Sequence, residues 1–284
     1  MEGLGYYNGE IKPIKELKIP VTDRAIYFGD GVYEVCYCIN KKPFAIDEHI
    51  NRFYDSLSLL KIDFKTKKQE LKKIIEYVIK KHDAKHQSVY WQVSRASAIR
   101  NHVFPSNKKP NLLIMVTENK IVDMKKTRYD LILEQDTRFL HCNIKTLNLI
   151  PAVLASEKAK QNNCQEAVLH RGETITECAH SNVGILKDGV FKTAPLNNLI
   201  LPGVTRAHLI KICENLNVPV LEKPFTIKEL LEADEVIVLA SGCLCMGVNS
   251  INGKKVGNKA PSLLKTLQNS YEKLFISRCG ESYI

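Results

Sequence analysis

The run His141-Cys-Asn-Ile-Lys-Thr-Leu-Asn-Leu-Ile-Pro151 places one lysine, Lys145, inside an uncharged and largely apolar stretch. Burial among such neighbours disfavours the ammonium form of a lysine side chain. A neutral amine can attack a carbonyl carbon and form a Schiff base. Because the chain is rich in lysine and most lysines are solvated, this run predicts a catalytic residue only if other segments supply the groups that such chemistry needs.

The length and composition of the chain indicate a two-domain α+β protein. It has 284 residues, of which 44% are hydrophobic and 25% are charged. This is enough apolar material for two cores in domains of roughly 100–150 residues each. We predict a small N-terminal domain at residues 1–119, a linker at residues 120–127 and a larger C-terminal domain at residues 128–284. The linker prediction rests on the polar composition of Asn119–Arg128, which holds neither Gly nor Pro.

The sequence also bears on where the protein resides. No apolar run is long enough to cross a bilayer, and the opening residues MEGLGYYNGEIKP lack the features of a secretion signal. The nine cysteines are an odd number in a long chain, so we expect reduced thiols and no disulfide framework. These observations predict a cytoplasmic protein with no membrane partner.

Neither metal binding nor nucleic-acid binding is indicated. The pairs Cys36-x-Cys38 and Cys243-x-Cys245 lack the Cys-x-x-Cys spacing of structural zinc sites. The net charge of +10 suits an anionic partner, but the lysines are spread along the chain and are not gathered with aromatic residues. We therefore predict no metal and no nucleic-acid partner, and expect the charge to attract small anionic molecules.

Strands and amphipathic helices are predicted in both halves of the chain. Strands are expected where β-branched and aromatic residues gather, at Val32–Ile39, Val89–Ser94, Asn111–Glu118, Tyr129–Asp136 and Glu235–Ala240. Hairpin turns are expected at Asn8-Gly9, Asp188-Gly189 and Asn252-Gly253. Helix N-caps are expected at Asp47, at Thr66 with a capping box to Gln69, and at Thr226 with a capping box to Glu229.

Three segments away from Lys145 carry groups that a cofactor could use. On the helix after Asp47, His49 and Arg52 stand one turn apart and can address the same site. A Pro-Gly loop leads into a helix start at Val204-Thr205, whose first amides have no partners within the helix and can bind an anion. Glu177 follows a β-rich run and offers a carboxylate.

Several other cofactor and nucleophile motifs are absent from the sequence. Gly29-Asp-Gly31 lacks the third glycine of a dinucleotide loop, because Glu34 stands at that position. There is no Gly-x-x-x-x-Gly-Lys-Ser/Thr run and no Gly-x-Ser-x-Gly elbow. Hydride transfer, nucleotide hydrolysis and serine esterase chemistry are therefore disfavoured.

Pyridoxal 5′-phosphate has needs that these segments meet. It requires a lysine for its aldehyde, an acid for its pyridine nitrogen and an anion-binding group for its phosphate. Lys145 and Glu177 supply the first two groups, and Arg52 with Val204-Thr205 supplies the third. The sequence therefore predicts this cofactor.

Seven short runs match the motifs of a known family, in the family's own order and across nearly the whole chain: Tyr27–Glu34, Glu48–Arg52, Asn143–Asn148, Thr176-Glu177, Ser181-Asn182, Asp188-Gly189 and Leu201–Arg206. Through them the chain resembles the fold-type IV (class IV) pyridoxal-phosphate-dependent aminotransferases, and among these most the D-amino acid aminotransferases. The resemblance implies a small N-terminal α/β sandwich-like domain and a larger C-terminal pseudo-barrel domain. It also implies a homodimer with sites at the subunit interface.

The segment Arg95–Pro105, RASAIRNHVFP, carries the resemblance to the D-specific enzymes. It is similar to a segment that in those enzymes closes over the neighbouring subunit's site. The resemblance implies that Arg100 and His102, joined by Tyr33, bind the substrate α-carboxylate. An arginine fork flanked by two further donors holds a carboxylate in one orientation, and so decides which face of the α-carbon meets the lysine.

Two segments depart from the family's pattern. Cys178-Ala179-His180 follows the acid where the D-specific enzymes usually have Gly-Ser-Ser, so an imidazole replaces a hydroxyl near the cofactor. Ser241-Gly242-Cys243 replaces a hydroxyl-rich run near the phosphate, which leaves Ser241 and the Gly242 amide as cofactor-binding groups. We expect these departures to affect cofactor affinity and substrate range, but not the roles of Lys145 and Glu177.

The predicted function is transamination between a D-amino acid and a 2-oxo acid, of the kind that converts D-alanine and 2-oxoglutarate to pyruvate and D-glutamate. The alternatives on the same fold are a branched-chain L-amino acid aminotransferase and an aminodeoxychorismate lyase. An alternative of another class is a non-catalytic protein that binds a cofactor or nucleic acid, which the charge of +10 and the altered Cys178–His180 segment motivate.

Overall fold

The computed structural model describes residues 3–284, which fall into two compact units. The first unit holds the chain up to Lys120 together with Ile144–Asn148 and Phe275–Tyr283, and the second unit holds nearly all of the rest. Two segments of the range predicted as the C-terminal domain therefore belong to the first unit. The predicted limits at residues 119 and 128 remain a prediction.

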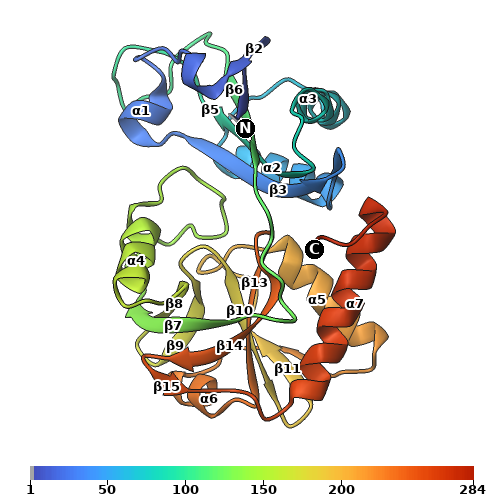
Figure 1. Ribbon diagram of the computed structural model, residues 1–284. Coiled ribbons are helices and arrows are strands. Elements are labelled where there is room, and N and C mark those ends of the chain that lie inside the picture. The colour runs from blue at the N-terminus through green and yellow to red at the C-terminus, as the bar shows by residue number, and fades with distance from the viewer. Residues whose placement is uncertain (1–2) are drawn as a thin grey trace. The chain divides into compact units, whose positions relative to one another are not determined.

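The first unit is built on a six-stranded antiparallel sheet in the order β2-β1-β6-β5-β3-β4 (Figure 1). Its strands are β1 (Leu4–Tyr7), β2 (Glu10–Pro13), β3 (Gly31–Ile39), β4 (Lys42–Pro43), β5 (His86–Ser94) and β6 (Asn111–Glu118). The hairpin predicted at Asn8-Gly9 joins β1 to β2, and both turn residues have positive φ.

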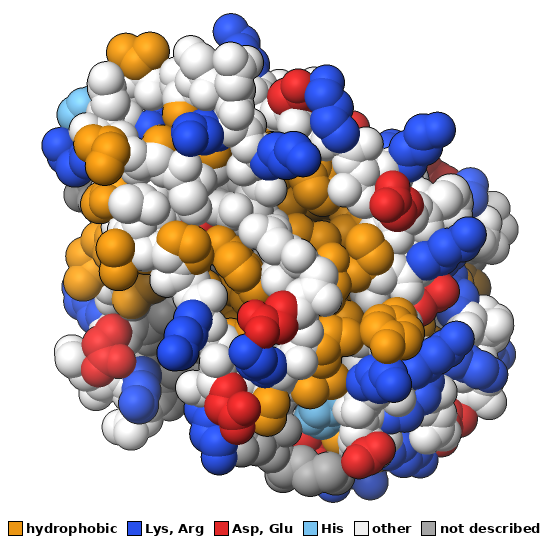
Figure 2. Space-filling model, turned by 90° about the horizontal axis from the view of Figure 1, so that it is seen from above, with side chains coloured by type: hydrophobic (Ala, Val, Ile, Leu, Met, Phe, Trp, Pro, Cys, Tyr) orange, Lys and Arg blue, Asp and Glu red, His pale blue; other side chains and the backbone are white. Residues whose placement is uncertain are grey.

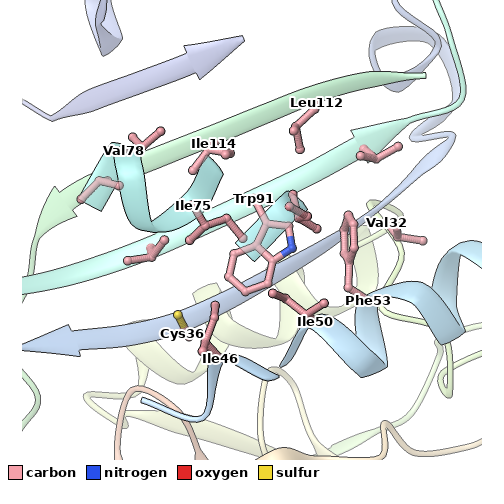
Figure 3. Packing of buried hydrophobic residues seen from close by; sticks show 14 of the residues in the cluster. Val32, Cys36, Ile46, Ile50, Phe53, Ile75, Val78, Trp91, Leu112 and Ile114 are labelled. Atoms are coloured by element: carbon pink, nitrogen blue, oxygen red, sulfur yellow. The ribbon is translucent and has the colours of Figure 1, made fainter. Parts of the chain in front are cut away.

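Two helices cover one face of this sheet and close the core of the first unit. They are α2 (Ile46–Leu59) and α3 (Lys68–Lys81); a short helix α1 (Arg24–Phe28) and a 3₁₀ turn η1 (Ile14–Glu16) precede them. Trp91 of β5 is fully buried, and Phe53 of α2 packs edge-on against it with 6.1 Å between ring centroids (Figure 3). This aromatic packing, together with Ile75 of α3 beside it, fixes the position of α2 and its polar residues against the sheet.

Two of the predicted helix starts are wrong and one is confirmed. Helix α2 begins at Ile46, after Ala45 in a left-handed conformation, so Asp47 lies inside the first turn and not at the N-cap. Helix α3 begins at Lys68 without a side-chain cap, two residues after Thr66. The capping box of Thr226 is present, with the Thr226 hydroxyl accepting from the Glu229 amide.

The second unit contains a nine-stranded mixed sheet. Its main path is β12-β11-β10-β13-β14-β7-β8-β9, with β15 paired to β14. The strands are β7 (Arg128–Gln135), β8 (Glu166–Arg171), β9 (Thr174–Cys178), β10 (Asn182–Lys187), β11 (Val190–Thr193), β12 (Val220–Glu222), β13 (Glu235–Ala240), β14 (Leu244–Ile251) and β15 (Lys254–Lys255). The hairpins predicted at Asp188-Gly189 and Asn252-Gly253 are confirmed.

Four helices accompany this sheet: α4 (Ile150–Gln161), α5 (Val204–Asn215), α6 (Ile227–Glu232) and α7 (Pro261–Cys279). Helices α5 and α7 lie side by side in Figure 1, and His208 of α5 is 3.2 Å from the Tyr271 hydroxyl of α7. The last turn of α7, from Phe275, belongs to the first unit.

The sheet of the second unit has to curl. Strand β10 is third along the path and β9 is eighth, so in a flat sheet they would lie about 24 Å apart at about 4.8 Å per strand. Only Ala179–Ser181 connect them, and the four Cα–Cα steps from Cys178 to Asn182 span at most about 14 Å. The sheet therefore bends back on itself, as the predicted pseudo-barrel requires.

Other global features concern charge, thiols and membranes. All nine cysteines are free thiols, and Cys36 and Cys38 lie fully buried on β3. On the face shown in Figure 2, Lys and Arg side chains are spread out and interspersed with acidic ones. Within residues 3–284 there is no helix long and apolar enough to span a membrane, and no group of three His, Cys, Asp or Glu residues that could hold a metal ion.

Candidate active site

Lys145 is fixed by backbone contacts within the first unit. Its carbonyl accepts from the Tyr33 amide at 2.9 Å, and the Leu147 amide donates to the Gly31 carbonyl at 3.1 Å, so the segment runs antiparallel to the start of β3. The Lys145 amide donates to the Ser56 hydroxyl of α2 at 3.2 Å. The lysine is therefore held by a strand on one side and a helix on the other.

The Lys145 amine lies 4.3 Å from the centroid of the Tyr33 ring, and the lysine is half-buried. The structure thus brings together two residues that the sequence assigned to catalysis and to substrate binding. Of the apolar neighbours in the run, Ile144 is buried and Leu149 is 37% exposed. The aromatic face of Tyr33 contacts the amine.

A buried triad of Glu34, His49 and Arg52 lies in the same unit. Arg52 donates to both carboxylate oxygens of Glu34, from Nε at 2.6 Å and from Nη2 at 2.8 Å. His49 Nδ1 lies 2.8 Å from Glu34 Oε2. Both residues therefore contact Glu34, a partner that the sequence did not reveal, and their service of one cofactor site stays a prediction.

The charges of this triad follow from burial and pairing. Burial alone would raise the pKa of Glu34, but Arg52, and then His49, hold it well below its usual range. Burial lowers the pKa of His49, with Glu34 opposing this and Arg52 and Lys145 adding to it. Glu34 is therefore a carboxylate and His49 a neutral imidazole at neutral pH, and Arg52 is anchored in a bidentate pair.

Arg100 and His102 lie on an exposed loop of the first unit and gather around Phe28 at the end of α1. The Arg100 guanidinium carbon is 5.1 Å from the Phe28 ring centroid, and the His102 ring is also 5.1 Å from it. Arg24 binds the Asp30 carboxylate at 2.7 Å and donates to the His102 carbonyl at 3.5 Å, which ties this loop to the start of β3. The two predicted carboxylate-binding side chains are thus neighbours of one ring.

Glu177 lies on β9 of the second unit, is buried, and accepts from three donors. Asn182 Nδ2 donates to Oε2 at 2.8 Å, and the Leu201 amide donates to the same oxygen at 3.1 Å. Arg138 Nη1 donates to Oε1 at 2.5 Å. The carboxyl group is therefore held in one orientation.

Arg138 is a functional candidate that sequence reasoning missed. Asp136 anchors it, because Arg138 Nε donates to Asp136 Oδ1 and Nη2 donates to Asp136 Oδ2, each at 3.0 Å. Thr176, next to Glu177 on β9, also donates to Asp136 at 2.9 Å. The available signal was the Asp-x-Arg sequence at the end of a predicted strand, but sequence alone could not link it to Glu177, 39 positions beyond Arg138.

Burial and pairing set the proton affinities of this group. Burial raises the pKa of Glu177 to about 7, although Arg138 and the Leu201 amide oppose the rise. Burial would also raise the pKa of Asp136, but its bonds to Arg138 and Arg171 lower it to about 2. In the Glu177–Arg138 pair only the raised pKa of Glu177 bears on proton transfer, because the arginine stays protonated.

The raised pKa of Glu177 predicts a pH dependence of stability in the cofactor-free protein. The folded-state pKa of Glu177 is about 7, above the ordinary glutamate value of 4.5, so it stabilises the fold fully below pH 4.5, and this contribution is lost as the pH rises through 7. Glu177→Gln cannot ionise, so between pH 5 and 8 its unfolding free energy should vary less than that of the wild type, by up to about 3 kcal/mol. Urea unfolding measures this, and Glu157→Gln on the exposed face of α4 should follow the wild type.

The remaining predicted cofactor-binding residues also lie in the second unit. Val204 and Thr205 form the buried first turn of α5, whose N-cap Gly203 has no capping side chain. A Cβ on Gly203 would lie 1.9 Å from the Asn182 side-chain oxygen, so glycine is required there. Ser241 and Gly242 form the tight turn between β13 and β14, and Gly242 is exposed.

Comparisons with known proteins identify the class. A family model described as amino-transferase class IV matches residues 31–251, and the chain belongs to this family. It is 37% identical over 281 residues to a D-alanine aminotransferase of Listeria monocytogenes serotype 4b (strain F2365), covering 96% of each chain. It is also 37% identical over 276 residues to a D-alanine aminotransferase of Staphylococcus haemolyticus, covering 96% of this chain and 98% of that one.

Solved structures agree on the fold. The branched-chain amino acid aminotransferase from Escherichia coli matches with a TM-score of 0.88 and 22% identity over 99% of this chain and 96% of that one. A branched-chain amino acid aminotransferase from T.th., solved with pyridoxamine 5′-phosphate, matches with a TM-score of 0.87 and 23% identity, over 99% and 95% of the two chains. This chain is therefore a fold-type IV aminotransferase, and pyridoxal phosphate is its cofactor.

The residues present fit that cofactor. The structure holds a half-buried lysine amine against an aromatic ring, a buried carboxyl fixed by three donors, and a helix start whose first amides lack intrahelical partners. These are the chemical types that an aldehyde, a pyridine nitrogen and a phosphate require.

Proposed function

We propose that this aminotransferase transfers the amino group between a D-amino acid and a 2-oxo acid, with D-alanine and 2-oxoglutarate giving pyruvate and D-glutamate. The observation that carries the proposal is the 37% identity to D-alanine aminotransferases over 96% of this chain. The segment with Arg100 and His102, two cationic or hydrogen-bonding groups on one exposed loop, supports a site for a carboxylate.

We assign Lys145 as the catalytic lysine. Pyridoxal phosphate, when bound, supplies an aldehyde that condenses with amines and a ring that accepts electrons from the substrate carbon. The Lys145 amine would hold the cofactor aldehyde and, once released, would accept the proton from the substrate α-carbon, and its backbone bonds to β3 and α2 keep that amine in one place. Glu177 would keep the pyridine nitrogen protonated, because a cationic ring nitrogen would offset the burial that disfavours the Glu177 carboxylate.

We assign the cofactor phosphate to the cationic and amide groups that the sequence predicted. Arg52 is the cationic group, and its bidentate bond to Glu34 fixes its orientation. The first-turn amides of Val204 and Thr205 are the second set of donors, because the helix leaves them without internal partners. Ser241 and Gly242 contribute a hydroxyl and an amide. Substrate α-carboxylate binding is assigned to Arg100, His102 and Tyr33.

A stereochemical half-reaction tests the proposed substrate. The cofactor-loaded enzyme is mixed with D-alanine or L-alanine and the visible band of the cofactor is followed. We expect the D-isomer to bleach the band at least about 100-fold faster, because a carboxylate clamp presents only one face of the α-carbon to the lysine. Bleaching by the L-isomer alone would instead favour a branched-chain L-aminotransferase, for which the solved structures show a shared fold and no more. Release of an aromatic amine from aminodeoxychorismate would indicate the lyase.

We further propose that the protein is a cytoplasmic homodimer. Large apolar side chains are exposed on two segments, at Ile150, Val153 and Leu154 of α4 and at Ile99, Val103 and Phe104 of the Arg100 loop, with exposed fractions between 54% and 83%. Contiguous exposed apolar side chains are typical of subunit interfaces. Light scattering after size-exclusion chromatography should give twice the monomer mass of 32.2 kDa, and Val153→Asp with Leu154→Asp should give the monomer. A wild-type monomer mass would contradict the proposal.

A further inference from the structure

Arg24, the first residue of α1, is a buried arginine that binds the backbone of the Arg100 loop, the exposed residues 99–104. Its guanidinium donates to three consecutive carbonyls of this loop: Asn101 at 2.5 Å, His102 at 3.5 Å and Val103 at 3.4 Å. Hydrogen bonds from a charged donor are stronger than those between neutral groups. One side chain therefore holds the part of the loop that directly follows Arg100.

Asp30 fixes the orientation of Arg24. Arg24 Nε donates to Asp30 Oδ2 at 2.7 Å, and Arg95 Nε donates to the same oxygen at 2.9 Å. The Asp30 side chain is 12% exposed, so little water competes for these bonds. Because one carboxylate serves two guanidinium groups, Asp30 would keep Arg95 as its cationic partner if the side chain of Arg24 were removed.

The backbone at Arg24 holds the base of the same loop. The Arg24 amide donates to the Ala96 carbonyl at 3.0 Å, and the Ala98 amide donates to the Thr22 carbonyl at 2.9 Å. These bonds join peptide groups, so a substitution at residue 24 leaves them in place. The side chain of Arg24 thus controls the loop beyond its base.

Phe28 connects Arg24 to the side chains of the loop. The centroid of the Phe28 ring lies 4.8 Å from the guanidinium carbon of Arg24 and 5.1 Å from that of Arg100. The His102 ring centroid is also 5.1 Å from it. Since cations are attracted to the face of an aromatic ring, the contact with Arg24 holds the ring against which Arg100 and His102 pack.

Hydrogen bonds also join this group to the segment that carries Lys145. Asp30 directly precedes Gly31, whose carbonyl accepts from the Leu147 amide at 3.1 Å. Leu147 is two residues beyond Lys145. Within the first unit, the contacts of Arg24 therefore extend from the loop to the start of β3 and to the lysine segment.

We infer that Arg24 is a positioning residue, which holds the Arg100 loop in the conformation that binds the substrate α-carboxylate. The inference rests on the proposed function, which assigns Arg100 and His102 to that carboxylate, and it deepens it. If a loop adopts its binding conformation only part of the time, the apparent affinity for the ligand falls by that fraction. Saturating substrate restores the conformation, so loss of the Arg24 side chain raises KM and leaves kcat in place.

Steady-state kinetics of the cofactor-loaded enzyme test the inference with Arg24→Met. This variant removes the bonds to the loop, fills the space of the arginine stem and leaves Asp30 paired with Arg95, so the fold should survive. The KM for D-alanine and the KM for 2-oxoglutarate should each rise about tenfold, because both substrates carry an α-carboxylate. The value of kcat should change less than twofold. Unchanged KM values, or a fall in kcat alone, would overturn the inference.

The matched control is Arg278→Met. Arg278 also pairs with a carboxylate, that of Glu48, and its guanidinium carbon lies 5.7 Å from the Phe44 ring centroid, but its contacts are with α2 and the residues before it. This variant should leave both KM values unchanged, because an exposed ion pair contributes little.

Arg24→Lys separates position from charge. The ammonium keeps the positive charge, but its one nitrogen cannot reproduce a planar fork that binds Asp30 through Nε and the loop through both Nη atoms. Both KM values should therefore stay raised. Wild-type KM values in Arg24→Lys would show that Arg24 acts by charge alone, which would contradict a positioning role.

Hydrogen exchange followed by mass spectrometry measures the loop of the cofactor-loaded enzyme without turnover. The peptide that spans residues 97–105 should exchange about tenfold faster in Arg24→Met than in the wild type or in Arg278→Met. Equal exchange in all three proteins would overturn the inference. If neither D-alanine nor 2-oxoglutarate is a substrate, the proposed function fails, and the exchange comparison still decides whether Arg24 positions the loop.

Discussion

Lys145→Ala is expected to lose at least about 1000-fold in kcat for D-alanine with 2-oxoglutarate, because no other group is assigned to move the α-proton. The substitution should also abolish the visible absorption of the bound cofactor, since the amine that joins the aldehyde is gone. The fold should survive. The backbone bonds of residue 145 to β3 and α2 do not need the lysine side chain, which is half-buried and lies against Tyr33.

The matched control is Lys158→Ala, which removes an exposed lysine of α4 that pairs with Glu134. It should keep wild-type absorption and kcat, because exposed ion pairs contribute little. Added methylamine offers a second check, since a free amine can partly replace a missing lysine amine in proton transfer. An alanine variant that transaminates at the wild-type rate would remove Lys145 from the mechanism.

The sequence predicted the elements whose local signals are strong. The Asn-Gly and Asp-Gly hairpins and the Thr226 capping box form as expected, because their geometry is fixed by a few adjacent residues. The predicted starts of α2 and α3 failed because tertiary packing overrode local capping preference, as the left-handed Ala45 shows. Helix α7 carried no clear capping signal and was not predicted, although it is 19 residues long.

The same difference between local and long-range signals applies to the candidate site. Lys145, Arg52 and Glu177 were predicted as site residues because they lie in runs with recognisable composition. Glu34 and Arg138 were not identified as site residues, since their roles come from partners 18 and 39 positions away. Such long-range pairs depend on the sheet order, which the sequence does not specify residue by residue.

Glu34→Gln is expected to lower the free energy of unfolding by about 3–5 kcal/mol, the cost of leaving one partner of a buried ion pair unpaired. Glu34 is fully buried and Arg52 is 9% exposed, so water cannot replace the lost charge. Because the pKa of Glu34 is lowered in the folded state, its pairing stabilises the protein at any pH above the ordinary carboxyl pKa. This stabilisation is lost only as the pH falls toward the lowered pKa. Urea unfolding at pH 7 measures the effect. The control is Glu48→Gln. Glu48 lies on the same helix as Arg52 and forms an exposed ion pair with Arg278. This variant should lower the free energy of unfolding by less than about 1 kcal/mol.

A double variant separates the structural role of the triad from its proposed role at the phosphate. Replacing both partners, in Glu34→Gln with Arg52→Met, removes the unpaired charge and should recover most of the lost stability. If Arg52 binds the cofactor phosphate, the recovered protein should still bind pyridoxal phosphate at least about tenfold more weakly than the wild type, by the loss of one charge-assisted contact. If stability is recovered and the affinity for the cofactor stays at the wild-type value, the triad has a structural role only. In that case the phosphate would depend on the amides of Val204 and Thr205 and on the turn at Ser241.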